Sequence, residues 1–334
     1  MDRLIGVVQH YDWGSTTALT GLRGEAPSGR PEAELWFGAH PAGPSKFASD
    51  GRTATVGELP VLAKFLAVAR PLSLQVHPDD VSAALGHQLE EEDGLAADDP
   101  RRCFPDPVGK PEVVLAVERF ISLCGLLPAT EALAGAQAAG LPDVVVDPLA
   151  DGDLAGAVVA ALAADHPDDP AQHLVPLMRR VVLEPGDALF VSPGMLHTHL
   201  SGLAVEVMPR SDSVARAGLT TKHVDVETVL DLMDSEAVPE ILRPRDGDHA
   251  YDLPTDAFAV RRLCQCTGAV GGGRPTVVVC AAGRATAKTG GMRADEVTIG
   301  AGEAMWLGPD DGPVEVCADG TAYLVAPGSA TLGS

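Results

Sequence analysis

Apolar and polar side chains alternate along the stretch PLSLQVHPDD, from Pro71 to Asp80. Successive side chains of an extended strand point to opposite faces, so the leucines and the valine of this stretch can face a core. Ser73, Gln75 and His77 then share the other face, where they would line a cavity. The competing interpretation is the ordinary polar face of an exposed strand, and residues elsewhere in the chain bear on the choice.

The hydrophobic pattern predicts β structure on both sides of a helical segment. Residues 1–60 have the pattern of short strands between turns, and the stretch GKPEVVLAVERFISLCGL has that of two further strands. Residues 128–180 are rich in alanine and predict helices, with breaks at 140–142 and 166–170. Strand patterns return over 178–208, and short strands with glycine-rich turns run from about Tyr251 to the C-terminus.

Three segments depart from this strand pattern. The large apolar residues of 59–66 follow a helical period, which predicts a helix before the strand, with Lys64 off its apolar stripe. Residues 79–107 are polar and acidic and predict a solvated excursion that could form a lid. The stretch VDVETVLDLMDSEAVPEIL predicts a further helix, for which Asp225 is a candidate N-cap.

Length and composition limit the class of protein. A chain of 334 residues predicts two or three domains, and 36 glycines with 27 prolines favour a turn-rich β architecture. The net charge of −23 argues against nucleic-acid and membrane partners. We find no apolar segment of signal-peptide or membrane-span length, and the six cysteines form no C-x-x-C pair. These features predict reduced thiols and a cytoplasmic protein.

A metal site is the chemistry that the alternating stretch suggests. Gln75 and His77 offer an amide and an imidazole on one strand face, and a metal ion needs further ligands. Glu112, in VGKPEVVLAV, and His197, in PGMLHTHLSG, are the candidates. Two imidazoles, a carboxylate and an amide oxygen would suit Zn²⁺.

Two stretches are similar to a motif of the cupin superfamily. EPGDALFVSPGMLHTHLSG resembles the second cupin motif, in which glycine turns bracket a strand that carries a metal-binding histidine. AGEAMWLGPDDGPVEV resembles the same motif without its histidine. The resemblance implies two cupin-type jelly-roll barrels, of which the N-terminal one holds a metal and the C-terminal one is metal-free.

The chain resembles the type I mannose-6-phosphate isomerases over nearly its whole length. The strings that carry the resemblance are HYDWGS, AELWFGAHP, KFLAVARPLSLQVHPDD, GKPE and, above all, LAVEVMPRSDSVARAGLTTKHVD. The family interconverts mannose 6-phosphate and fructose 6-phosphate with one zinc ion. By motif, the zinc ligands fall on Gln75, His77, Glu112 and His197, and the family's active-site arginine falls on Arg216.

The resemblance and the pattern together predict a mainly β fold with a helical insert. The predicted domains are a discontinuous catalytic cupin domain, 1–125 and 181–245, an α-helical insert, 126–180, and a C-terminal cupin-like β domain, 246–334. The expected partner is a small sugar phosphate, and we expect a monomer that binds neither nucleic acid nor membrane.

Lysine usage identifies candidates for phosphate binding. The chain has only five lysines, and three of them lie inside the motif strings. Lys64 and Ser73 are therefore predicted to bind the substrate phosphate, as a point charge and a hydroxyl donor. Arg216 and Lys222 could each contact the phosphate or a developing oxyanion. Trp13 is a candidate for substrate contact, with core packing as its alternative use.

Departures from the family pattern leave the proton-transfer residue open. Gly109 stands where the family often has a histidine before the carboxylate ligand. Lys110, Glu206 and His199 remain the candidates for acid–base catalysis, and His199 could also compete as a metal ligand. A catalytically silent sugar-phosphate-binding cupin and a cupin Fe(II) oxygenase are the alternative functions. The fourth ligand, Gln75, argues against the oxygenase because it leaves fewer open metal positions.

Overall fold

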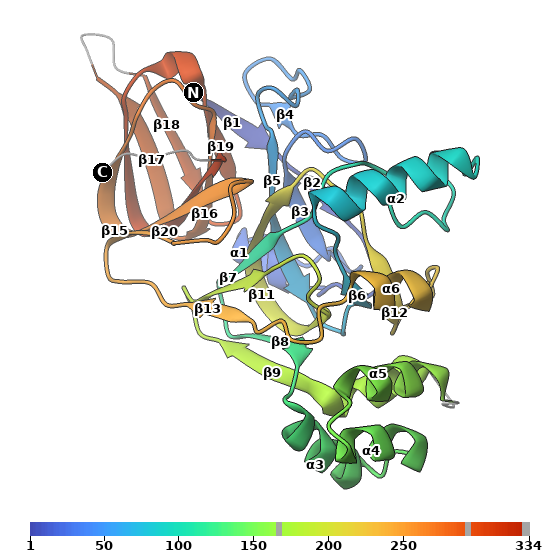
Figure 1. The fold of residues 1–334 in the computed structure, drawn as a ribbon. Coiled ribbons are helices and arrows are strands. Elements are labelled where there is room, and N and C mark those ends of the chain that lie inside the picture. Colours follow the sequence, from blue (N-terminus) through green and yellow to red (C-terminus); the bar gives the residue numbers. More distant parts are fainter. Residues whose placement is uncertain (165–168, 291–294, 329–334) are drawn as a thin grey trace.

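The computed structural model describes residues 1–164, 169–290 and 295–328 and consists mainly of two antiparallel β-sheets with peripheral helices (Figure 1). This confirms the prediction of a mainly β fold. Of the two predicted helix breaks, the one at 140–142 separates two helices, and most of the one at 166–170 lies outside the described residues. No helix among the described residues has the length and apolar character needed to cross a bilayer.

The first sheet has eleven strands and holds most of the first half of the chain. Its main path is β13 (Glu240–Leu242), β10 (Ala188–Val191), β7 (Glu112–Ala116), β11 (His197–Pro209), β5 (Val61–Val68), β3 (Glu34–Phe37) and β2 (Val7–Gln9). Joined to this path are β6 (Leu74–Val76), β8 (Phe120–Leu126), β9 (Met178–Leu183) and β12 (Ala215–Gly218).

The second sheet has nine strands and contains the C-terminal part of the chain. Its main path is β14 (Asp248–Ala250), β15 (Phe258–Val270), β20 (Val314–Pro327), β16 (Thr276–Ala282), β19 (Ala304–Leu307), β1 (Asp2–Ile5) and β4 (Lys46–Phe47), with β17 (Arg284–Thr289) and β18 (Glu296–Gly300) attached. Strands β1 and β20, the first and the last in the described residues, thus belong to the same sheet. The predicted catalytic domain starts at residue 1, whereas the sheets place β1 and β4 with the C-terminal strands; the domain division itself stays a prediction.

The described residues also form helices. They are α1 (Ala18–Leu22), α2 (Asp80–Glu92), α3 (Ala129–Ala139), α4 (Asp143–Ala150), α5 (Leu154–Ala163) and α6 (Val226–Leu232), with 3₁₀ segments at Pro170–Leu177 and Pro309–Asp311. Helices α3 to α5 confirm the predicted helical character of 128–180. The Asp225 carboxylate accepts from the Thr228 N–H and caps α6, as predicted. The acidic stretch after Pro78, predicted to be a solvated excursion, contains the 13-residue helix α2, in which the buried residues are Ala83 and Gly86.

The helix predicted over 59–66 is wrong. Residues 61–68 form β5, in which every residue is buried. Phe65 packs into the core between the two sheets, whereas Leu66 lies in an apolar cluster on the opposite face of β5. A strand that is buried on both faces shows a continuous apolar run instead of an alternation, and that run coincided with a helical period.

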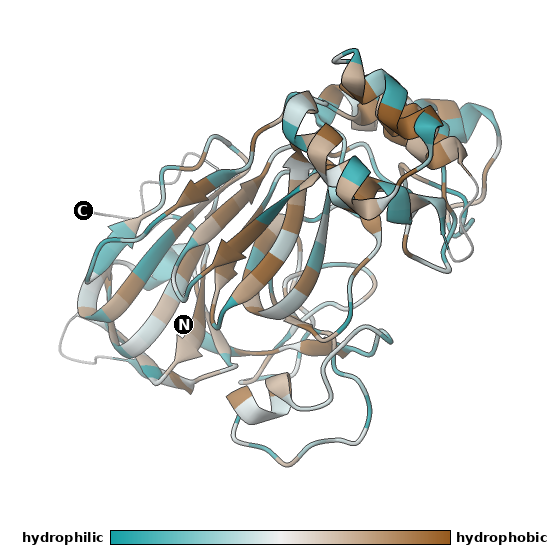
Figure 2. Cartoon of the chain, turned by 90° about the horizontal axis from the view of Figure 1, so that it is seen from below, coloured by the Kyte–Doolittle hydropathy of each residue, from teal (hydrophilic) through white to brown (hydrophobic). Residues whose placement is uncertain are grey.

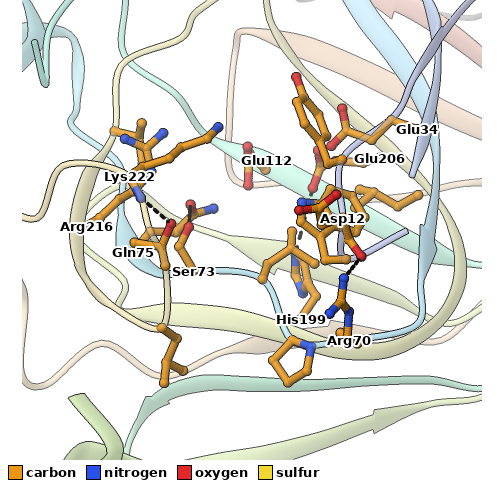
Figure 3. A pocket seen from close by; sticks show the side chains of 18 of the residues that line it. Asp12, Glu34, Arg70, Ser73, Gln75, Glu112, His199, Glu206, Arg216 and Lys222 are labelled. Carbon is orange, nitrogen blue, oxygen red and sulfur yellow. Dashed lines mark hydrogen bonds and ion pairs between the residues drawn. The ribbon is translucent and has the colours of Figure 1, made fainter. Parts of the chain in front are cut away.

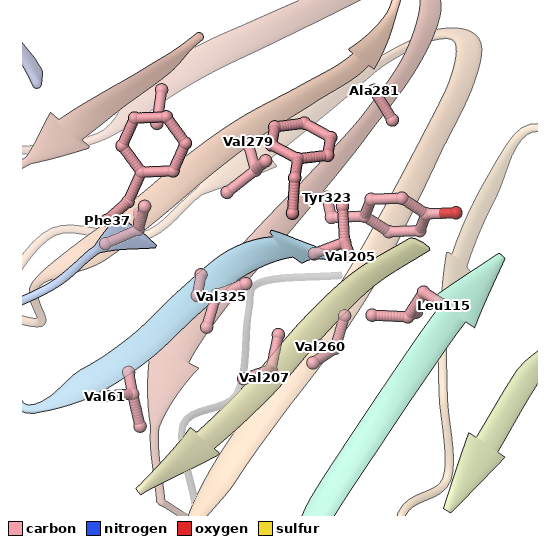
Figure 4. Packing of buried hydrophobic residues seen from close by; sticks show 14 of the residues in the cluster. Phe37, Val61, Leu115, Val205, Val207, Val260, Val279, Ala281, Tyr323 and Val325 are labelled. Atoms are coloured by element: carbon pink, nitrogen blue, oxygen red, sulfur yellow. The ribbon is translucent and has the colours of Figure 1, made fainter. Parts of the chain in front are cut away.

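The two sheets pack face to face around one hydrophobic core. Phe37, Val61, Leu115, Val205 and Val207 come from the first sheet, and the residues opposite them come from the second: Val260, Val279, Ala281, Tyr323 and Val325 (Figure 4). Figure 2 shows hydrophobic segments on neighbouring strands of the sheets and hydrophilic ones in many of the loops. Burial of this shared apolar surface joins the two sheets into one structure.

The opposite face of the first sheet carries a polar row. Because side chains alternate along each strand, the residues between the core residues point away from the second sheet. Trp36 lies opposite Lys64 on the neighbouring strand, and Lys64 lies opposite Glu206 on the next. The alternation that places apolar side chains in the core therefore also directs Lys64 and Glu206 to the opposite face of the first sheet.

Truncation of a large side chain in the shared core should lower the free energy of unfolding. We expect Phe65→Ala to lower the free energy of unfolding by about 3–5 kcal/mol, because the ring is fully buried and packs edge to face on Phe37. The matched control is Val81→Ala on α2, whose side chain is 76% exposed and whose loss should cost about 0.5 kcal/mol or less. Urea titrations of both variants would measure this difference, and equal losses would contradict the assignment of the core.

Candidate metal centre and its cavity

The polar face of the first sheet borders a cavity of about 630 Å³ (Figure 3). Ten of the twelve predicted site residues line it: Trp13, Lys64, Ser73, Gln75, Lys110, Glu112, His199, Glu206, Arg216 and Lys222. The other two, His77 and His197, are almost fully buried and do not line it themselves. They lie beside Glu112, which does.

Three of the four predicted metal ligands form a compact cluster. The candidate ligand atoms of His77, Glu112 and His197 all lie within 4.8 Å of one another. The Nε2 atom of His77 is 3.4 Å from Glu112 Oε1, and the Nε2 atom of His197 is 3.8 Å from Glu112 Oε2. One ion can therefore contact all three residues after small side-chain adjustments.

The backbone orients both imidazoles toward this point. The Nδ1 atom of His77 lies 3.0 Å from the carbonyl oxygen of Ser213, and the Nδ1 atom of His197 lies 2.9 Å from that of Met195. A carbonyl can only accept, so each Nδ1 carries the proton and each Nε2 presents its lone pair to the cluster. This is the tautomer that a metal ion requires.

The cluster contains buried polar atoms that the protein leaves unsatisfied. His77 Nε2 and Glu112 Oε2 are buried and have no hydrogen-bond partner within the described part of the chain. Such atoms cost about 1–3 kcal/mol each, and a bound cation would remove that cost. Burial lowers the pKa of His77 and lowers that of His197 to about 3, so both rings are neutral ligands at neutral pH. The donor set thus fits Zn²⁺.

The amide of Gln75 adjoins the same cluster. Gln75 lies directly opposite His197 in the pairing of β6 with β11, and its amide Nε2 is 3.4 Å from His197 Nε2. The Ser73 hydroxyl donates to the other end of the amide, Oε1, at 2.9 Å. Reversal of the amide would bring its oxygen to the metal side, and the Ser73 hydroxyl would then accept from Nε2.

A second charged group occupies the neighbouring wall of the cavity. The Lys64 ammonium is 2.6 Å from Glu206 Oε2 and 3.4 Å from Glu34 Oε1, and all three side chains are buried. Burial lowers the pKa of Lys64, but the carboxylates of Glu206 and Glu34 outweigh it and raise the pKa above the ordinary value. Lys64 is therefore charged and already neutralised by two carboxylates.

His199 is placed between this wall and the metal cluster. Its Nδ1 atom is 2.9 Å from the Ser122 hydroxyl, and its Nε2 atom is 3.7 Å from Glu206 Oε1. Its ring also packs against Phe120, at a centroid distance of 5.2 Å. The side chain is held in place while Nε2 faces the cavity.

The rim of the cavity carries two cations without a carboxylate partner. Neither Arg216 nor Lys222 takes part in an ion pair among the described residues, and the Lys222 ammonium lies 5.1 Å from the centre of the Tyr11 ring. Loss of solvent lowers the pKa of Lys222, and the nearby charge of Arg216 lowers it further. Asp212 and Glu206 are the carboxylates that could pair with Arg216. Among the described residues Asp212 pairs with His40 and Glu206 pairs with Lys64, so neither pairs with Arg216.

The backbone of Asp79 and Asp80 fills the space that a side chain at position 109 would need. A Cβ atom at this position would lie 2.5 Å from the backbone nitrogen of Asp80. The Gly109 N–H donates to the Asp80 carboxylate, so the first turn of α2 adjoins the loop directly. The next residue, Lys110, places its ammonium 3.2 Å from Glu112 Oε1.

Sequence reasoning missed several residues of the cavity. Tyr11, Glu34 and Asp212 line it, and burial raises the pKa of Tyr11 to about 12. The alternation of Glu34 and Trp36 around Leu35 is a period-2 signal that could have identified Glu34. Burial raises the pKa of Asp212, but the hydrogen bond from His40, together with the nearby ammonium groups of Lys110 and Lys64, outweighs it and holds the pKa below the usual range.

Loss of one imidazole should weaken metal binding strongly. We expect His77→Ala to weaken Zn²⁺ binding by at least about 100-fold, because changes in outer-shell residues alone cost 10–100-fold. The control is His249→Ala, in β14 of the other sheet. Zinc would be measured by mass spectrometry after dialysis against a weak chelator, with circular dichroism as a check of folding. Equal zinc content in folded samples of both variants would exclude the cluster as the binding site.

The sequence matches a family model described as phosphomannose isomerase type I, catalytic domain, over residues 1–56 and 50–129. The chain is 31% identical to a mannose-6-phosphate isomerase of Salmonella typhimurium, an alignment that covers 97% of this chain and 98% of that protein. It is 30% identical to the mannose-6-phosphate isomerase of Escherichia coli K12, with coverages of 95% and 97%.

Solved structures give the same result for the fold. A mannose 6-phosphate isomerase from Salmonella typhimurium, solved with its substrate fructose 6-phosphate and a zinc atom, superposes with a TM-score of 0.82 at 27% identity. The apo form from the same organism gives a TM-score of 0.83. Each alignment covers 98% of this chain and 99% of the other. Similarity of this extent, in sequence and in structure, shows that the chain belongs to the mannose-6-phosphate isomerase family.

Proposed function

We propose that this protein is a zinc-dependent aldose–ketose isomerase that interconverts mannose 6-phosphate and fructose 6-phosphate. The observation that carries the proposal is the convergence of His77, Glu112 and His197 beside a polar cavity, in a chain that belongs to this family. A relative with the same fold was solved with fructose 6-phosphate and zinc. The cavity also has the cations and carboxylates that a sugar phosphate needs.

Gln75, His77, Glu112 and His197 are the residues that would hold the zinc ion. A bound zinc ion supplies positive charge that polarises sugar oxygens and stabilises a developing enediolate. Only one ligand of this set, Glu112, is negative, so the site keeps net positive charge. Lys110 adds a further positive charge 3.2 Å from Glu112.

The rim cations are the proposed phosphate site. Arg216 and Lys222 are free of carboxylate partners within the described residues, and an anion is the ligand that their two charges favour. Ser73 lies on the same side of the cavity and offers a hydroxyl (Figure 3). Lys64 is less suited to this role than predicted, because Glu206 and Glu34 already neutralise it. Its direct contact with phosphate stays a prediction.

Proton transfer between C2 and C1 of the open-chain sugar requires a group that can donate and accept. His199, Glu206 and Lys110 are the candidates, and all three reach the cavity. His199 and Glu206 belong to one wall, where Nε2 and the carboxylate lie 3.7 Å apart. Lys110 belongs to the opposite loop, beside the metal cluster.

The finer fold assignment belongs to the same proposal. We infer two cupin-type barrels, a catalytic one with the helical insert and a metal-free one at the C-terminus. The second sheet supports this assignment, because no histidine follows His249 in the sequence. The monomeric state and the cytoplasmic location stay predictions.

A direct assay would test the function. We expect the purified protein to convert mannose 6-phosphate to fructose 6-phosphate in a coupled assay, to lose this activity on prolonged chelation and to regain it with Zn²⁺. The same samples would be analysed for zinc. Activity that persists in metal-free protein would refute a catalytic zinc, and tight sugar-phosphate binding without turnover would favour a silent binding protein.

The charge of Lys222 should make substrate binding depend on pH. Its pKa is lowered, so the ammonium is present at lower pH and is lost as pH rises through that reduced value. We therefore expect KM for mannose 6-phosphate to rise already at pH values below 10.5, the ordinary pKa of lysine, and Lys222→Arg to flatten the rise because arginine stays charged. Lys288→Arg, on an exposed strand of the other sheet, is the control. An unchanged slope in Lys222→Arg would remove Lys222 from the phosphate site.

A further inference from the structure

His40 is a buried histidine that does not line the cavity but contacts a residue that does. Its side chain is 3% exposed, and its Nε2 atom lies 3.1 Å from Asp212 Oδ2. The Asp212 side chain is 58% exposed and belongs to the cavity lining. The imidazole ring packs edge to face against Trp36, with a centroid distance of 4.9 Å and an angle of 77°.

The backbone determines which nitrogen of His40 carries the proton. The Ala42 N–H donates to Nδ1 at 3.2 Å, so Nδ1 presents its lone pair and has no proton. The ring proton is therefore on Nε2, which donates to Asp212. The pair is a hydrogen bond from a neutral imidazole to a carboxylate, with the direction of donation set by the turn after β3.

The backbone around Asp212 is held by hydrogen bonds that do not involve His40. The Asp212 N–H donates to the Asp106 carboxylate, and the hydroxyls of Ser211 and Ser213 donate to the carbonyls of Val108 and Asp106. These bonds fix the main chain of the segment but leave the Asp212 side chain free to turn. The hydrogen bond from His40 fixes that remaining rotation.

We propose that His40 is a positioning residue, which holds the Asp212 carboxylate in the orientation that binds a hydroxyl of the sugar substrate. The contact of His40 is with Oδ2, at 3.1 Å, so Oδ1 can accept from the substrate. The inference rests on the proposed isomerase function and deepens it. It assigns a role to a histidine that lies in the turn after β3.

The test uses a double-mutant cycle on the full-length zinc-loaded protein. His40→Phe keeps the ring on Trp36 and removes the donor, whereas His40→Gln restores an N–H near the position of Nε2. Asp212→Ala removes the acceptor. The control is His249→Phe, because His249 packs on Tyr251 with the same geometry, 4.9 Å and 77°, in the other sheet.

We expect His40→Phe to lower kcat/KM about 10- to 100-fold, the effect of a small misplacement in an active site, and His40→Gln to recover most of the loss. In the background of Asp212→Ala, His40→Phe should cost no more than about 3-fold further, because the side chain that it positions is gone. His249→Phe should leave kcat/KM unchanged. Independent losses in the double variant, or a failure of His40→Gln to recover activity, would overturn the proposal.

A second measurement separates this inference from the proposed function. The same four variants and the control would be titrated calorimetrically with fructose 6-phosphate, and the coupling between His40 and Asp212 should appear in Kd. A protein that binds fructose 6-phosphate without turnover would refute the isomerase, while the coupling in Kd would still decide the role of His40.

Discussion

Alternation of side chains along strands that are buried on both faces is the constraint on which this structure depends. In β5, β7 and β11 one set of residues enters the core shared with the second sheet, and Lys64, Glu112 and Glu206 stand at alternate positions of these strands, on the opposite face. Lys64, Glu206 and Glu112 are buried there. Buried charges are stable only when they are paired or bind a cation, which explains both the Lys64 network and the composition of the metal cluster.

The group around Lys64 and the group around Glu112 differ in how completely the protein pairs their charges and hydrogen-bonding atoms. Lys64 has a carboxylate on each side, so its wall of the cavity is closed by the chain itself. At Glu112 the protein supplies Lys110 and two neutral imidazoles, and within the described residues a carboxylate oxygen and an imidazole nitrogen have no hydrogen-bond partner. The rim has the opposite imbalance, with two cations and no paired carboxylate among the described residues. A phosphorylated sugar complements that arrangement, even in a chain with a net charge of −23.

Local pattern predicted those features that depend on neighbours in sequence. The alternation through Gln75 and His77, the cap at Asp225 and the helices within 128–180 all follow from residues a few positions apart. The sequence pattern did not predict those features that tertiary contacts determine. Burial on both faces concealed β5, and no local signal places β1 beside β19 at the other end of the chain. The contact of His40 with Asp212 likewise joins distant segments, and only the fold brings it about.

Gly109 shows how a departure from a family pattern can follow from packing. The backbone of α2 approaches this residue so closely that any side chain would require the helix or the loop to move. In return, the Gly109 N–H bonds to Asp80, and the N–H of Lys110 donates to the carbonyl of Pro78. These bonds hold Lys110 against Glu112. Because the start of α2 fills the space of any side chain at Gly109, Lys110 remains the candidate for acid–base catalysis on this side of the cavity.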